Sequence, residues 1–390
     1  MPSQELPPLS QLKFNPDGLS VWRMLLAAEA FALNNSPTRY NDLVIGVRVV
    51  GFFLKDFWDH SHLGFGSTPY RRLVLAISSC NAMGNHPPGS LQQVQDRNEA
   101  IIALGLRLRN YLMRLFRSNT WPTPPSSTRS PYPSFEVHKS EMIKAMPKAD
   151  KTKKEVREQA LERDGYACMI TGLFDYASAR RFPEVREKAE SGRGIAMTQC
   201  AHLFSESAQS SNDPVIEYAT TSFAMLSLFG LDEQVRRLLG GQVNSLHNVF
   251  TMTTQMHLSF DQYELWLEEV PGMTNTYDVC SYDDVFFKYC EKPPRRVTFQ
   301  VDPAVVAECE EAGISPPDLP DRTLIAIRSA CARVAHLSGA AEQMDQVQQD
   351  TEATTVMAND GSTADLLSSL LLQHIECGAK QGIESYLRGT

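Results

Sequence analysis

Four side chains in the middle of the sequence have the types and the order needed to cut a phosphodiester bond: His202, Asn248, His257 and Asp261. An imidazole titrates near neutral pH and can activate a water molecule. An Asn on a neighbouring strand can fix the orientation of that imidazole. A His and an Asp four residues apart on a helix face the same way and can hold one cation. These residue types predict hydrolysis assisted by a single metal ion, with His202 as the base and His257 and Asp261 as ligands.

Short apolar stretches suggest how these side chains are positioned. Residues 200–204 form an isolated apolar stretch typical of a strand, and residues 248–252 predict a second strand that pairs with it. Two threonines can then cap a helix, which the sequence predicts over residues 255–269. His257 and Asp261 would project from one face of that helix.

The regions on the N-terminal side are predicted to be helical. Apolar faces recur across residues 19–117, most clearly at 21–31 and 98–117. The arginines of the second segment are interpreted as a solvated helix face, with phosphate contact as the alternative; they are Arg107, Arg109, Arg114 and Arg117. Five prolines between Ser118 and Ser134 indicate a linker.

Downstream of the linker, the sequence predicts a further mixture of helices and strands. A charged helix begins at Thr152 and ends at Gly165, and a strand and turn follow at residues 166–172. The interval between His202 and Asn248 is predicted to be mostly helical. The remaining predictions are a strand at 296–301 and helices at about 321–338, 340–358 and 362–374.

The order strand, long loop, strand, helix resembles the ββα-metal core of HNH endonucleases, and the fuller match is to the fungal HNH-nuclease-domain proteins. The likeness covers about residues 150–365, and its motifs are moderately specific. The segments that carry it are Arg163-Asp164-Gly165-Tyr166-Ala167-Cys168-Met169-Ile170-Thr171-Gly172, Ala201-His202-Leu203, residues 244–252, His257-Leu258-Ser259-Phe260-Asp261, and the stretch from Leu319 to Glu342.

This resemblance implies roles for the four residues. His202 would be the general base, and Asn248 would position that base or support the metal. His257 and Asp261 would bind a divalent ion, Mg²⁺ first, with Mn²⁺ or Zn²⁺ as alternatives. Many HNH enzymes have an Asp or His ligand at the position of Ala201, so the resemblance leaves a further ligand to be supplied by Asp213, Glu206 or Asp164.

We therefore expect an α+β protein, mostly helical, with a ββα-metal (HNH) core that contains a long helical insertion and has helical flanking regions. Its expected parts are a helical N-terminal region (1–117), a Pro/Ser-rich linker (118–150), an HNH nuclease-like domain (151–300) and an acidic helical C-terminal extension (301–390). The expected function is metal-dependent cleavage of nucleic acid, with DNA as the first choice. A catalytically degenerate HNH fold that binds nucleic acid or protein is the alternative.

The composition and the charge of the sequence limit the classes of protein that are possible. The sequence has 390 residues, of which 42% are hydrophobic and 21% are charged, as in ordinary globular proteins. No run of 18 apolar residues predicts a membrane span, and no Cys-x-x-Cys pair predicts a thiolate zinc site. We expect an intracellular protein, cytoplasmic or nuclear. The net charge of −9 resides in residues 301–390, which carry 5 basic and 14 acidic side chains and could recruit a protein partner.

Structural interpretations compete with the functional ones. His202 could be a satisfied core histidine, and His247 is expected to point to the other side of its strand. The spacing of Asp59-His60-Ser61-His62 resembles a metal site, but a loop is the favoured interpretation. Cys168 and Cys200 are expected to be small buried side chains. Tyr263 and Trp266 are expected to pack on the helix after His257, with base stacking as the alternative.

Overall fold

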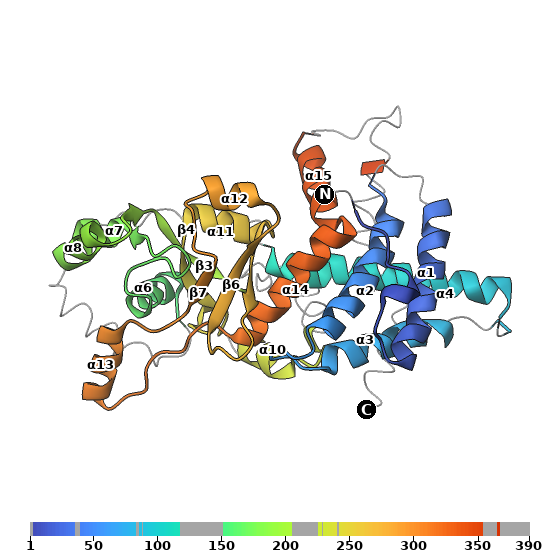
Figure 1. The fold of residues 1–390 in the computed structure, drawn as a ribbon, viewed down its shortest axis with the longest axis horizontal. Helices are drawn as coiled ribbons and strands as arrows, with labels where there is room; N and C mark the ends of the chain where they lie inside the picture. Colours follow the sequence, from blue (N-terminus) through green and yellow to red (C-terminus); the bar gives the residue numbers. More distant parts are fainter. Residues whose placement is uncertain are drawn as a thin grey trace. The chain divides into compact units, whose positions relative to one another are not determined.

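A computed structural model describes residues 3–35, 40–82, 86–87, 89–117, 151–204, 225–227, 229–239, 242–353 and 365–366. The chain divides into two compact units (Figure 1). Unit 1 comprises Met1–Arg114, Ala224–Gly230 and Ala330–Thr390, and unit 2 comprises Leu115–Phe223 and Leu231–Ser329. The fold is α+β and mostly helical, as expected. The predicted linker at 118–150 and nearly all of the helix at 362–374 lie outside the described residues.

Unit 1 is built from helices whose apolar faces pack against one another. Trp22, Phe53 and Phe57 are completely buried in its core. Two helices approach closely at Gly46 and Gly105, where a Cβ on Gly105 would lie 1.7 Å from the carbonyl oxygen of Gly46. The elements are η1 (Leu9–Gln11), α1 (Pro16–Asn35), α2 (Asp42–Asp59), α3 (Thr68–Ser79), η2 (Cys80–Ala82), α4 (Leu91–Arg107), a π-helical turn η3 (Leu108–Leu112), the start of η4 (Met113–Phe116), the second half of α14 (Arg322–Ser338) and α15 (Ala340–Ala353).

The arginines after α4 do not all lie on a solvated face, so that prediction was wrong for Arg109 and Arg117. Both are buried, at 2% and 9% exposure. Arg109 donates hydrogen bonds to Asp42 Oδ1 at 2.7 Å and to Gln343 Oε1 at 2.6 Å. The physical reason for Arg109 is that these two acceptors replace the water that its buried guanidinium would otherwise bind.

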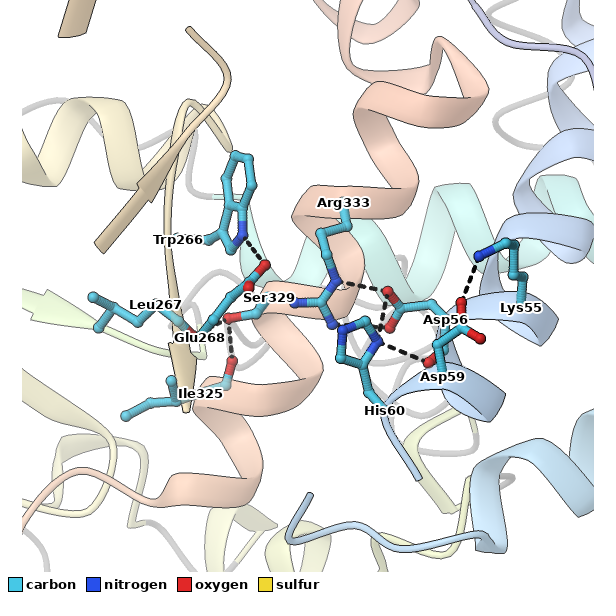
Figure 2. Close-up of polar contacts among 10 residues, drawn as sticks. All are labelled: Lys55, Asp56, Asp59, His60, Trp266, Leu267, Glu268, Ile325, Ser329 and Arg333. Atoms are coloured by element: carbon cyan, nitrogen blue, oxygen red, sulfur yellow. Dashed lines mark hydrogen bonds and ion pairs between the residues drawn. The ribbon is translucent and has the colours of Figure 1, made fainter. Parts of the chain in front are cut away.

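The sequence around His60 forms an ion-pair cluster at the end of α2 (Figure 2). Arg333 of α14 binds both carboxylate oxygens of Asp56, through Nε at 2.6 Å and Nη2 at 2.9 Å. His60 Nδ1 lies 3.3 Å from Asp56 Oδ1. Burial opposes ionisation of Asp56, but Arg333 and His60 outweigh it and lower its pKa to about 2. The hydrogen bond to Asp56 raises the pKa of His60 above its usual value.

Unit 2 carries every strand in the part of the chain that the structure describes, and these strands form three small sheets. Parallel strands β1 (Phe174–Asp175) and β2 (Ile195–Ala196) form one sheet, and antiparallel strands β3 (Thr198–His202) and β4 (Val249–Thr253) form the second. The third has the antiparallel order β5 (Leu265–Glu269), β6 (Thr276–Ser281), β7 (Arg296–Thr298). The remaining elements are α6 (Lys153–Arg163), α7 (Tyr176–Arg181), α8 (Pro183–Ser191), α10 (Asp232–Leu239), η6 (Gln242–Asn244), α11 (Thr254–Asp261), α12 (Asp284–Tyr289), α13 (Pro303–Ala312) and the first half of α14.

Helix α6 begins and ends where the sequence predicts. Thr152 and Glu155 form a capping box at its start, and Gly165 takes the left-handed conformation just after its end, with φ 65°. Of the strand and turn predicted at 166–172, the turn is confirmed and the strand was wrong, because only Ala167 makes a β-bridge, to Phe174. The left-handed Tyr166, with φ 62°, breaks the extended backbone at its first residue.

The helix predicted at 255–269 was wrong in its second half. Helix α11 ends at Asp261, and Tyr263 adopts φ 65°, which turns the chain away from the helix. Strand β5 then begins at Leu265. Leu265 and Leu267 are buried and Trp266 between them is half-buried, which is the two-residue alternation of a strand. Ser329 Oγ of α14 lies 2.6 Å from the carbonyl oxygen of Leu267, which holds α14 against β5 (Figure 2).

Helices α14 and α15 confirm the predictions at 321–338 and 340–358 within the described residues, and β7 confirms the strand near 296. Each described cysteine is a free thiol. None of the helices in the described part of the chain is long and apolar enough to cross a membrane.

Candidate functional site

The candidate site is built on the β3–β4 pair and on α11, which follows β4 without a loop. The register places His202 opposite Val249, so His202 ends its strand beside the start of β4. Helix α11 begins at Thr254, where the Thr253 hydroxyl caps it by accepting a hydrogen bond from the amide of Met256. The helix packs on both strands, and the rings of Phe250 and Phe260 meet edge to face at 5.6 Å.

Asn248 is completely buried and holds the chain just beyond His202. Its Oδ1 accepts a hydrogen bond from the amide of Phe204 at 2.9 Å. Its Nδ2 donates to the carbonyl oxygens of Phe204 and Val243, both at 3.0 Å. The amide of Leu203 also donates to the carbonyl of Asn248, at 2.7 Å. Asn248 therefore fixes the strand end that carries His202 through the backbone of that strand.

Asn244 fixes the imidazole of His202. His202 Nε2 lies 3.3 Å from Asn244 Oδ1. An amide oxygen can only accept, so the proton of the neutral ring lies on Nε2 and the lone pair lies on Nδ1. This tautomer gives His202 Nδ1 the electronic character of a base.

Arg163 and Asp164 hold the backbone on both sides of Asn248. Arg163, completely buried, donates from Nη1 to the carbonyl of Leu246 at 2.8 Å and from Nη2 to that of Val249 at 2.9 Å. Asp164 accepts from Arg163 Nε at 2.7 Å and from the amide of Thr251 at 2.8 Å. Asp164 was one candidate for the further metal ligand, and both of its carboxylate oxygens already accept hydrogen bonds, from Arg163 and from the amide of Thr251.

His257 is held as a neutral ring with a defined tautomer. Its Nδ1 lies 2.7 Å from Gln199 Oε1, an acceptor on β3, so Nδ1 carries the proton and Nε2 carries the lone pair. Burial, with the positive charge of Arg328, lowers the pKa of His257 to about 4. At neutral pH the ring is therefore uncharged, which is the state in which an imidazole binds a metal.

Asp261 lies one helical turn beyond His257 and faces a buried arginine. Arg328 Nη2 lies 3.4 Å from Asp261 Oδ1 and donates to the carbonyl of Phe260 at 2.5 Å. Arg328 Nη1 donates to the carbonyl of Leu203 at 3.2 Å. Burial raises the pKa of Asp261 to about 6, although the charges of Arg328 and His202 partly offset that rise. Arg328 thus ties the residue after His202 to the end of α11.

The donor atoms of His257 and Asp261 fit a cation. His257 Nε2 and Asp261 Oδ2 lie 3.3 Å apart, and above pH 6 neither atom carries a proton. Two lone-pair atoms at this distance repel each other, and a cation between them removes that repulsion. Adjacent ligands that each lie about 2.1 Å from a small divalent ion are themselves about 3.0–3.4 Å apart.

Other features limit this donor set. Ala201, where the resemblance to HNH enzymes leads one to expect a ligand, is completely buried and its side chain offers no donor atom. Among the described residues no group of three or more His, Cys, Asp and Glu side chains could hold a metal ion. Asp213 and Glu206 lie outside the described residues. The described residues therefore supply two donors here, one imidazole and one carboxylate.

The sequence did not identify four residues that position the site: Gln199, Asn244, Arg163 and Arg328. The two-residue alternation of a strand puts Gln199 on the same face as Ala201, the position at which the resemblance leads one to expect a metal ligand. That pattern could have identified Gln199. Arg328 interrupts the apolar run Leu324-Ile325-Ala326-Ile327, which is a sign of a buried charge.

The remaining sequence candidates supply none of these donor atoms. His247 pairs with Asp318 at 3.0 Å at the surface, and His60 belongs to the cluster in unit 1. Tyr263 and Trp266 are not on a helix, and Trp266 Nε1 donates to Glu268 at 2.8 Å. Comparisons of the chain with models of protein families, with curated proteins and with solved structures gave no match.

Proposed function

We propose that unit 2 contains a ββα-metal nuclease site of the HNH type, which hydrolyses phosphodiester bonds of nucleic acid with Mg²⁺. The observation that carries this proposal is the way two strands and the helix that follows hold the four predicted residues. Asn248 clamps the strand end of His202, and α11 presents His257 Nε2 and Asp261 Oδ2 at 3.3 Å. Arg328 donates to the carbonyl of Leu203, next to His202, and to the carbonyl of Phe260, next to Asp261.

His202 would act as the base. In the tautomer fixed by Asn244, its Nδ1 takes a proton from water, and the water oxygen attacks phosphorus as the bond to the departing 3′ oxygen breaks. The 3′ oxygen then takes a proton from solvent. His257 and Asp261 would hold the ion, which when bound supplies positive charge beside the phosphate and the departing oxygen. Gln199 and Arg328 would keep the two ligands oriented.

Metal binding and cleavage test this proposal separately. Titration with Mn²⁺ by electron paramagnetic resonance should show binding that His257→Ala and Asp261→Asn both abolish. A supercoiled plasmid should be nicked in Mg²⁺ and remain intact in EDTA. Wild-type protein that binds no Mn²⁺ at millimolar concentration and nicks nothing would overturn the proposal.

A second function has an observation in its favour. Arg328 already supplies a buried positive charge beside Asp261, and Ala201 supplies no ligand. A catalytically degenerate HNH fold that binds nucleic acid or protein would keep this internal cation in place of a metal. Such a chain should bind its partner in EDTA as tightly as in Mg²⁺, and His202→Ala should leave every measured property unchanged.

A further inference from the structure

We propose that the end of α12 and the loop after it bind a single-stranded stretch of nucleic acid beside the candidate site. The residues concerned are Lys288, Tyr289 and Lys292, which we call the α12 platform. The choice of nucleic acid as partner rests on the proposed function, whereas the geometry of the platform does not.

Tyr289 presents an aromatic ring to solvent. Its side chain is 77% exposed, compared with 47% for Tyr176 on α7. Val285, one turn earlier on the same face of α12, is 57% exposed. A single exposed apolar side chain needs no explanation, so the argument depends on what surrounds this ring.

The backbone after Tyr289 is held in an unusual conformation. Glu291 and Lys292 have φ 51° and 44°, two consecutive non-glycine residues in the left-handed region, and Pro293 and Pro294 follow. Side chains rarely adopt this conformation, and it persists only where its surroundings impose it. The Glu291 carboxylate accepts a hydrogen bond from the Thr253 hydroxyl. This hydrogen bond attaches the platform to Thr253, the residue just before α11. Thr253 and His257 are four residues apart, which is about 6 Å along the helix axis.

Two lysines of this region have no ion-pair partner among the described residues, and nor have two carboxylates, Asp283 and Glu291, which accept hydrogen bonds from the amide of Phe286 and the hydroxyl of Thr253. Arg296 binds Asp278 through two hydrogen bonds, of 2.6 and 3.0 Å, and Arg295 pairs with Asp284 at 3.1 Å. Lys288 and Lys292 are exposed and form no ion pair with any residue that the structure describes. Lys288 precedes the exposed ring in the sequence and Lys292 follows it, which suits a chain in which phosphates alternate with bases.

The ring selects a single strand over a duplex. Stacking on Tyr289 needs the open face of a base, and a duplex buries those faces within its own stack. A base held on Tyr289 would belong to the strand that runs from the platform toward His257.

Fluorescence anisotropy in EDTA tests the platform without cleavage. The probes are a labelled 12-nucleotide oligothymidine, a 12-base-pair duplex and, as an acidic polypeptide, polyglutamate, with the full chain as the protein. Tyr289→Ala should weaken binding to the single strand roughly 5- to 150-fold, the range for one stacked base, and Tyr289→Phe should restore it. Lys288→Ala with Lys292→Ala should make the negative slope of log K against log salt shallower by about 1.4.

Matched controls remove the same groups elsewhere on unit 2. Tyr176→Ala, and Lys153→Ala with Lys154→Ala, should bind within about twofold of wild type. The platform is overturned if Tyr289→Ala binds as wild type does, if the duplex binds more tightly than the single strand, or if only polyglutamate binds and Tyr289→Ala abolishes that binding. A chain that binds as expected but never nicks plasmid in Mg²⁺ supports the platform and overturns the nuclease.

Discussion

The side chain of Asn248 pairs with the backbone of Phe204 as a neighbouring strand would, accepting from its amide at 2.9 Å and donating to its carbonyl at 3.0 Å. This pairing continues the β3–β4 ladder two residues past His202. The geometry explains why an amide is needed here, because only Asn or Gln offers a donor and an acceptor side by side.

Asn248→Asp should therefore loosen the end of β3. The carboxylate keeps the shape of the amide but loses the donor that serves Phe204 and Val243. Two buried acceptors left without partners should lower the free energy of unfolding by about 2–4 kcal/mol. Hydrogen exchange of the peptide 198–204 should accelerate, and Asn275→Asp, in a turn of the same unit, should not change it. Unchanged exchange in Asn248→Asp would show that the Asn248 side chain does not hold the end of β3.

Arg163→Lys should disturb the same segment from the other side. A lysine keeps the positive charge but cannot reach the carbonyls of Leu246 and Val249 together with Asp164. We expect a loss of about 3 kcal/mol in the free energy of unfolding. Hydrogen exchange should accelerate at residues 246–251, measured against Arg157→Lys on the same helix. Equal protection in the two variants would show that the fork of Arg163 is dispensable.

Gln199→Leu should weaken metal binding without removing a ligand. The amide oxygen of Gln199 holds the proton of His257 on Nδ1 and so directs the lone pair of Nε2 toward Asp261. Loss of such an outer partner costs roughly 10- to 100-fold in metal affinity. Isothermal titration with Mn²⁺ measures this, and Gln255→Leu, at an exposed position of α11, is the control. An unchanged dissociation constant would contradict the role of Gln199.

The stability of unit 1 should depend on pH through Asp56 and His60. The pKa of Asp56 is lowered to about 2, so its contribution is present above its unfolded value of about 4 and is lost as pH falls toward 2. The pKa of His60 is raised, so its contribution is full below about 6.5 and is lost as pH rises through the folded value. The cluster should therefore stabilise most between about pH 4 and 6.5.

Melting temperatures of three proteins check this pH dependence. His60→Gln should destabilise unit 1 more at pH 5.5 than at pH 8.5. Asp56→Asn should lower the free energy of unfolding by about 3 kcal/mol at both, because it leaves Arg333 without its bidentate partner. A His60→Gln effect that is equal at the two pH values would show that the imidazole contributes no charge to the cluster.

Local pattern predicted the elements that are stabilised by local interactions. Strands β3 and β4 were recognisable from their apolar stretches, and the start of α11 from its threonine cap. The end of α11 was mispredicted because Leu265 and Leu267 suit a helix and a strand alike. In addition, the left-handed residue at the turn is Tyr263 and not a glycine, which is the residue type that predicts such a turn from sequence. Such a turn is imposed by tertiary contacts.

The positioning residues could not be predicted from sequence for a related reason. Arg328 acts on atoms 68 and 125 residues away in the chain, and Arg163 on a carbonyl 83 residues away. Their partners are backbone carbonyls, which every residue has, so no spacing of residue types reveals them. The side chains expected to do chemistry are found by type, whereas those that position them are found only in three dimensions.

Plasmid nicking by His202→Ala tests the central claim most directly. Wild-type protein in Mg²⁺ should convert supercoiled plasmid to the open circle. His202→Ala should slow this at least about 100-fold, as removal of a general base does, while Mn²⁺ binding is retained. His247→Ala, which removes a surface imidazole from the same segment, should cleave at the wild-type rate. Equal cleavage by wild type and His202→Ala, or none by either, would contradict the account.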